Sequence, residues 1–266
     1  MSDSVRPGTN VMPTIPNSAR IWNYAQGGQD NYQLDRDLAD VMMGDFPEIK
    51  TAAMESRAFQ ERVADHVVRE GGIRQLLDLG TGIPTGRGTH GTAQRVAPES
   101  RVVYVDNDPV VLNHASSLRS SPEGKIHYLQ QDFRLVDKVL DGASQTLNLD
   151  EPVALLVLST LGHFPPAEAA DLVEKYTSRL ASGSYLAVCD TIETPGVLKM
   201  QEHYLEADPE GAYLARKPAQ IEACARGLTL LPPGLRPLPE ILVPAGQDIP
   251  AGAADCVQWG FLAVKP

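Results

Sequence analysis

The chain has 266 residues, which is enough for one large α/β domain with extensions or for two small domains. Hydrophobic residues make up 42% and charged residues 21%, so a central sheet can be covered on both faces and wholesale disorder is not expected. A net charge of -11 and a pI near 5.0 would repel a phosphate backbone, and no Lys/Arg-rich run reverses this locally. We therefore expect no nucleic-acid partner and favour a small neutral or cationic molecule.

Three further features bear on the compartment. Cys189, Cys224 and Cys256 are far apart and odd in number, which predicts buried thiols in a reducing compartment and neither disulfides nor a metal site. Residues 1–10 lack the basic and apolar regions of a secretory signal, and no apolar stretch approaches the ~18 residues of a membrane span. The sequence thus predicts a cytoplasmic protein without a membrane partner, and it gives no signal for oligomeric state.

The N-terminal part is predicted to be helical after a flexible arm. Residues 1–16 are rich in Pro, Ser, Thr and Asn without periodicity, which is typical of a loose segment. A short helix is expected over Ser18 to Tyr24, followed by a second helix that Pro47 ends. Thr51 to Glu70 carries apolar residues at helical spacing and ends at a glycine pair. We expect residues 17–72 to form a helical extension ahead of the rest of the fold.

From residue 73 onward the pattern changes to short apolar runs separated by helical stretches, which is typical of buried parallel strands joined by crossover helices. The predicted strands are Gln75 to Leu79, Arg101 to Val105, Ile126 to Gln130, Val153 to Leu158 and Ser184 to Val188.

The remaining elements complete this α/β pattern. Helices are predicted to begin at Asp108-Pro109 and at Pro166, because proline is favoured at the first helical position, and a further helix is expected over Pro195 to Tyr213. The proline-rich stretch Leu231 to Pro250 predicts loop. The run Cys256 to Val264 predicts a final strand, paired antiparallel at the end of the sheet.

The first chemically informative segment is Leu76 to Pro84, with the sequence LLDLGTGIP. An apolar strand ends here in Asp78 and the loop Gly80-Thr81-Gly82, whose glycines let a ligand approach bare main chain. A loop that binds a dinucleotide pyrophosphate normally reads G-x-G-x-x-G and opens directly into a helix, which Pro84 makes less natural. Asp78 supplies a negative charge suited to a cationic amino-acid moiety.

Two further strand ends carry acidic residues. Asp106 and Asn107 follow the second strand, where a carboxylate can accept hydrogen bonds from the two hydroxyls of a ribose. Asp132-Phe133 follows the third strand, and its carboxylate can accept from an adenine amino group while the ring stacks beside it. Together these residues predict an adenosine-containing ligand, and acid-then-aromatic at the third strand favours S-adenosylmethionine over NAD.

Each of these positions also has a structural interpretation. Asp108 can be the N-cap of the following helix rather than a ligand, and Asp78 can cap its own loop. Asp132 can be a solvated loop residue, and Phe133 can belong to the core. The joint pattern favours the ligand interpretation over these alternatives.

With these residues in place, the chain resembles the S-adenosyl methyltransferase family long catalogued as a domain of unknown function. The resemblance spans Ser18 to Pro266, and its most specific element is residues 19–32, ARIWNYAQGGQDNY. The segments 78–84 (DLGTGIP) and 104–109 (YVDNDP) resemble further motifs of the family. Two departures concern the acceptor side: CARG stands at 224–227 where an aromatic pair and Asp-Gly are expected, and residues 236–244 lack a tryptophan.

The resemblance implies a Rossmann-like class I methyltransferase fold, with a mostly parallel sheet of seven strands, the last antiparallel. It also implies that the N-terminal helical extension, residues 17–72, closes as a lid over the cofactor site. Residues 73–266 would form the methyltransferase domain. Tyr24, Asp30 and Asn31 would contact the cofactor, although turn chemistry after Gly27-Gly28 is the structural alternative for the latter two. Thr160 is also assigned to the cofactor site.

His163, in the segment that follows the fourth strand, is the candidate general base, since an imidazole titrates in the range suited to proton removal. A structural role is its alternative, and Asp190 and Glu193 after the fifth strand are further candidates for the base. The sequence therefore predicts a methyltransferase that uses S-adenosylmethionine and acts on a small molecule. A catalytically silent protein that binds the same cofactor and a nicotinamide-dependent oxidoreductase are the two competing hypotheses.

Overall fold

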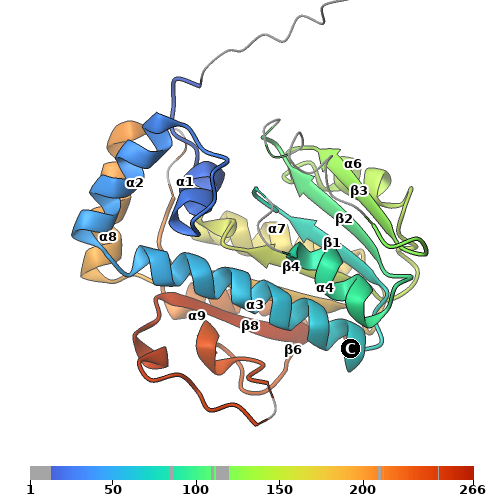
Figure 1. The fold of residues 1–266 in the computed structure, drawn as a ribbon. Coiled ribbons are helices and arrows are strands. Elements are labelled where there is room, and N and C mark those ends of the chain that lie inside the picture. The colour runs from blue at the N-terminus through green and yellow to red at the C-terminus, as the bar shows by residue number, and fades with distance from the viewer. Residues whose placement is uncertain are drawn as a thin grey trace, which may run out of the picture.

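The computed structural model describes residues 13–83, 87–108, 111, 120–208, 211, 213–244 and 246–266. Residues 1–12 of the predicted arm lie outside this part, as does most of the helix expected after Asp108-Pro109. Helices α3 and α4 cover one face of a twisted central sheet, and α6 and α7 cover the other (Figure 1).

The sheet is built around five parallel strands in the order β3-β2-β1-β4-β5, as the apolar runs predicted. These strands are β1 (Gln75–Leu79), β2 (Arg101–Asp106), β3 (Lys125–Gln130), β4 (Ala154–Leu158) and β5 (Tyr185–Thr191).

The C-terminal strand β8 (Gln258–Val264) runs antiparallel to β5, as predicted, but it does not lie at the edge of the sheet. The two-residue strand β6 (Thr229–Leu230) pairs with its other side and forms the edge. A further two-residue strand, β7 (Arg236–Pro237), also pairs with β8 inside the proline-rich stretch. The described residues therefore hold eight strands rather than the expected seven, because pairs of residues this short leave no periodicity in the sequence.

Alternate residues of the buried strands face opposite helical layers, which explains why the strands read as continuous apolar runs. Leu76 packs toward α3 (Ile49–Arg69) and α4 (Gly88–Val96), whereas its neighbour Leu77 packs toward α6 (Val136–Ala143) and α7 (Pro166–Ser178). Helix α3 lies within the predicted helical extension, residues 17–72, yet it packs on the sheet as part of the same core. The boundary between extension and methyltransferase domain at residue 72 therefore stays a prediction.

A third apolar cluster lies beyond the end of the sheet, where α1 (Ser18–Ala25), α2 (Gln33–Asp45) and α8 (Pro195–Ala207) come together (Figure 1). Ile21, Met42 and Met200 are members of this cluster, one from each helix. We call α1, α2 and α8 the helical roof. The elements α9 (Pro218–Glu222), η1 (Leu161–His163), η2 (Ala223–Ala225), η3 (Leu238–Glu240) and η4 (Ala253–Asp255) complete the fold.

Arg20 joins the roof to the sheet. Its buried guanidinium donates to Asp35 on α2 at 2.8 Å and to the carbonyl of Ile15 at 2.9 Å, and it lies 3.4 Å from the carboxylate of Asp108 beyond β2. Because a buried cation is stable only when it is paired, this arrangement fixes α1 at the carboxyl ends of the parallel strands.

Candidate functional site

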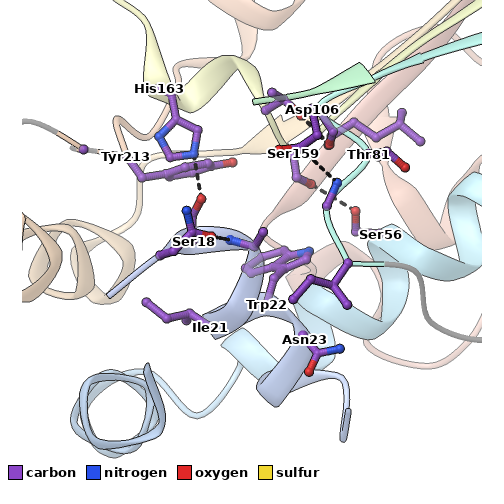
Figure 2. Close-up of a pocket in the computed structure, with 18 of the residues that line it drawn as sticks. Ser18, Ile21, Trp22, Asn23, Ser56, Thr81, Asp106, Ser159, His163 and Tyr213 are labelled. Atoms are coloured by element: carbon purple, nitrogen blue, oxygen red, sulfur yellow. Dashed lines mark hydrogen bonds between the residues drawn. The ribbon is translucent and has the colours of Figure 1, made fainter. Parts of the chain in front are cut away.

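A cavity of about 380 Å3 lies between the helical roof and the carboxyl ends of the parallel strands. Open α/β sheets generally bind ligands at this edge, and the volume falls in the usual range of small-molecule sites. Figure 2 shows residues of α1, including Ser18 and Trp22, facing Thr81, Asp106 and Ser159 across it. The predicted site residues that line the cavity are Asp78, Gly80, Thr81, Gly82, Asp106, Asn107, Asp132, Phe133, Thr160 and His163.

Asp78 at the end of β1 is the most deeply buried acid of the cavity wall, with 2% of its surface exposed. One of its oxygens, Oδ2, accepts from Thr89 at 2.6 Å and from Gln60 at 3.0 Å. Burial raises the pKa of Asp78 to about 6, against the lowering effect of these hydrogen bonds. A cationic ligand group beside it would favour its ionised form.

The two glycines of the loop, Gly80 and Gly82, are there for different structural reasons. Gly80 has a positive φ of 68°, and a Cβ there would lie 2.3 Å from the Thr160 side chain, so its glycine is required by packing alone. Gly82 also has a positive φ, of 61°, and faces Ala19 of α1. Its amide donates to Asp106 at 2.9 Å, which links the loop to the end of β2.

Asp106 is 9% exposed, and each of its oxygens accepts one backbone amide, from Gly82 at 2.9 Å and from Asp108 at 3.0 Å. Burial raises its pKa. Since a carboxylate has about four lone-pair sites, two remain for ligand hydroxyls. Asp108, in contrast, does not line the cavity and points its carboxylate toward Arg20.

The third strand end supplies a ring and a charged pair. Phe133 is buried and packs edge-to-face on Phe164 at 5.0 Å between ring centres, so it belongs to the core and to the cavity wall at once. The Arg134 guanidinium holds the pKa of Asp132 below its usual range and pairs with that carboxylate. Asn107 also lines the cavity and is itself exposed to solvent.

Three residues of the signature in residues 19–32 were predicted to contact the cofactor, and the structure places them outside the cavity lining. Tyr24 donates to Asp40 at 3.0 Å, and neither Tyr24 nor Asp30 nor Asn31 lines the cavity. The backbone amide of Asp30 and the side-chain amide of Asn31 instead donate to Oδ1 of Asn23, at 3.0 and 2.9 Å. Asn23 itself is 2% exposed and lines the cavity, so this turn orients a residue that the sequence did not single out.

Figure 2 shows His163 beside Ser18 and Tyr213 and away from Asp106 in the cavity lining. Its Nε2 is 3.0 Å from the Ser18 hydroxyl, and its ring packs edge-to-face against Tyr213 at 5.3 Å. Tyr213 donates to Asp190, which also pairs with the buried Arg216. Because Asp190 is committed to this pair and does not line the cavity, and Glu193 is exposed outside it, His163 is the base candidate that the geometry favours.

Ser159 is a further cavity residue that the sequence did not indicate. It has a positive φ of 55°, which is uncommon for a residue other than glycine and costs conformational energy. Its hydroxyl lies 3.0 Å from that of Ser56 on α3 (Figure 2). It donates to the side-chain oxygen of Gln258 on β8 at 3.2 Å. A sequence pattern cannot reveal this strain, because it arises from three elements far apart in the chain.

Comparisons with known proteins agree with this geometry. Residues 6–265 match the model of the S-adenosyl methyltransferase family. A DUF574 family protein from Streptomyces avermitilis is 35% identical with a TM-score of 0.89, over 95% of this chain and 98% of that one. A candidate methyltransferase from Thermobifida fusca is 30% identical with a TM-score of 0.87, over 98% and 99%. No curated protein matches the chain. In the described part of the chain, no helix is long and apolar enough to span a membrane.

Proposed function

Because the chain belongs to the S-adenosyl methyltransferase family and is a methyltransferase of that kind, we propose that the cavity binds S-adenosylmethionine along the strand ends and a small acceptor under the helical roof. The observation that carries the proposal is the pair of buried carboxylates, Asp78 and Asp106, on adjacent parallel strands at one cavity wall.

The wall residues fit the cofactor group by group. Asp106 retains lone pairs for two ribose hydroxyls, and the positive-φ backbone at Gly82 leaves the loop accessible. Phe133 offers a ring beside the third strand end, where an adenine can stack. A pyrophosphate would instead place two negative charges among the acids of this wall, so NAD fits less well.

The acceptor end has a different chemistry. It is lined by Ile21, Trp22, Met42, Ile49, Met200 and Tyr204, which form or adjoin the apolar cluster of the roof. Among the lining residues that the structure describes, the only permanent cations are Arg57 and Arg134, which contact the strand-end side, whereas Asp208 lines the cavity beside α8. A neutral or cationic acceptor with an apolar body fits this end better than an anion.

The chain contributes alignment and proton removal to the reaction. When bound, S-adenosylmethionine supplies an electrophilic methyl group on a sulfonium, and no protein nucleophile is needed. The roof and the strand ends enclose the two ligands and exclude water, which is how alignment lowers the barrier. His163 accepts the proton of an acceptor that is a poor nucleophile at neutral pH, and Ser18 and Tyr213 hold its ring.

Methyl transfer from labelled S-adenosylmethionine to a library of small acceptors tests this proposal. We expect label to pass to apolar neutral or amine acceptors and not to carboxylates or phosphates of similar size. Binding of S-adenosylhomocysteine without transfer to any acceptor would favour the silent binding protein instead. Transfer confined to anionic acceptors would contradict our assignment of the roof.

A further inference from the structure

Arg57 on α3 is a partly buried cation in the cavity wall that the predicted site does not use. Its guanidinium donates to Gln60 at 2.5 Å, to the carbonyl of Ile83 at 3.3 Å and to Gln26 at 3.4 Å. Among the described residues, its buried Nε has no hydrogen-bond partner and no carboxylate forms an ion pair with it. A guanidinium with a buried, unpaired N–H and no ion pair is costly for the ligand-free protein, which suggests that a ligand completes its hydrogen bonds.

Gln60 holds Arg57 close to Asp78 without a direct ion pair. The Gln60 amide accepts from Arg57 through its oxygen and donates to Asp78 through its nitrogen at 3.0 Å. Thr89 donates a further hydrogen bond to the same Asp78 oxygen and so helps to hold that carboxylate in place. The Gln60 side-chain amide therefore separates the partly buried cation of Arg57 from the buried carboxylate of Asp78, and all three side chains line the cavity.

This spacing matches the two charges of an α-amino acid, in which an ammonium and a carboxylate share one carbon. We propose that Arg57 binds the α-carboxylate of the methionine part of S-adenosylmethionine, while Asp78 takes its α-ammonium. The inference rests on the proposed function, since it assumes that this cofactor lies along the strand ends. It assigns a charge-specific subsite to a helix that precedes the glycine loop.

Two ligands test the subsite by binding alone. S-adenosylhomocysteine carries the amino-acid zwitterion, whereas S-adenosyl-3-thiopropylamine keeps the adenosine, the sulfur and the amine but lacks the carboxylate. Calorimetric titration of the wild-type protein should give about 10- to 100-fold tighter binding of the first, as expected for a charge-assisted, bidentate hydrogen bond. In Arg57→Met the two ligands should bind within about threefold of each other.

The matched control is Arg62→Met on the same helix. Arg62 is also partly buried, but it donates to the carbonyls of Leu238 and Ile241 and does not line the cavity. This variant should keep the wild-type preference for S-adenosylhomocysteine. Thermal melts of all ligand-free variants verify folding, and Arg57→Lys, which keeps the charge without the fork, should show an intermediate preference if Arg57→Met does not fold.

The outcomes separate this inference from the proposed function. If the wild-type protein binds neither adenosyl ligand, the proposed function itself fails. If it binds both equally, or if Arg57→Met or Arg57→Lys keeps the full wild-type preference, the cofactor site stands and the role of Arg57 is wrong. Loss of the preference in Arg57→Met, with the preference retained in Arg62→Met, supports the subsite.

Discussion

The two walls of the cavity differ in how they are built. At the strand-end wall, Asp78, Asp106 and Asp132 each lie within two residues of the carboxyl end of β1, β2 or β3, so local pattern and chemistry coincide. In the roof, Trp22, Met42 and Met200 come from three segments that meet only in the folded protein. The cofactor side of the cavity therefore follows from short sequence patterns, whereas the acceptor side depends on packing between distant segments.

The largest effect is expected at His163, the candidate general base. His163→Ala should lower the rate of methyl transfer by roughly 100- to 10,000-fold, the usual contribution of a general base, and leave the affinity for S-adenosylhomocysteine unchanged. His203→Ala is the control, because that imidazole binds Asp45 at 2.6 Å outside the cavity. Turnover by His163→Ala at the wild-type rate, on an acceptor that needs deprotonation, would reduce His163 to a structural role.

Two neighbouring acids, Asp106 and Asp108, test the assignment of the strand-end wall. Asp106→Ala should weaken S-adenosylhomocysteine by about 10- to 100-fold, or roughly 1.4–2.7 kcal/mol. Asp108→Ala should cost ~1 kcal/mol of folding stability and leave the affinity nearly intact, because its carboxylate faces Arg20 instead of the cavity. Calorimetric titrations and denaturant melts measure both quantities. The reverse pattern would mean that Asp108, two residues further on, is the ribose ligand.

The roof is tested by two aromatic residues of the same helix. Trp22→Ala removes part of the cavity wall and should weaken acceptor binding by about five- to tenfold, a loss of roughly 1–1.4 kcal/mol. Tyr24→Ala removes the hydrogen bond to Asp40 and part of the packing against the apolar cluster, both outside the cavity lining, and should leave the affinity unchanged. Steady-state KM and cofactor titrations report the two variants. A loss of cofactor affinity in Tyr24→Ala would restore the contact that the family resemblance implies.

The smallest effect concerns pH and Asp78. The folded pKa of about 6 lies above the ordinary 3.8, so the folded protein holds a proton that the unfolded chain has released. The stability of the ligand-free protein should therefore fall as pH rises from about 4 to about 6. The affinity for S-adenosylhomocysteine should instead rise, by about fourfold between roughly pH 5.5 and 7.5, because its ammonium favours the ionised carboxylate. Asp78→Asn should flatten both profiles, and equal slopes in variant and wild type would assign them to another group.

Prediction from the sequence succeeded where a pattern is local and failed where it is not. The five parallel strands and the long helix α3 follow from apolar periodicity, and ten predicted site residues line one cavity. The role of Asn23 was hidden, because Asp30 and Asn31 stand out in the motif while the residue that they orient stands upstream. Arg57 was hidden for another reason, since a single arginine on an amphipathic helix reads as a solvated charge until its burial is known.

The glycine loop shows a different limit. Its two glycines suggested close approach of a ligand, yet Gly80 is required by the neighbouring Thr160 side chain, and only Gly82 faces the roof across the cavity. A sequence gives the residue type but not the atom that excludes a Cβ. Motif glycines therefore predict a tight turn more securely than they predict a ligand contact.

The strand-end wall is assigned to an adenosyl amino acid rather than to a dinucleotide. Calorimetric titration of the full chain with S-adenosylhomocysteine and with NAD, at equal concentrations, tests this assignment. We expect saturable binding of S-adenosylhomocysteine, with a thermal stabilisation that grows as RT ln(1 + [L]/Kd), and little or no response to NAD. Binding of NAD that is as tight as that of S-adenosylhomocysteine, or no binding of S-adenosylhomocysteine, would contradict it.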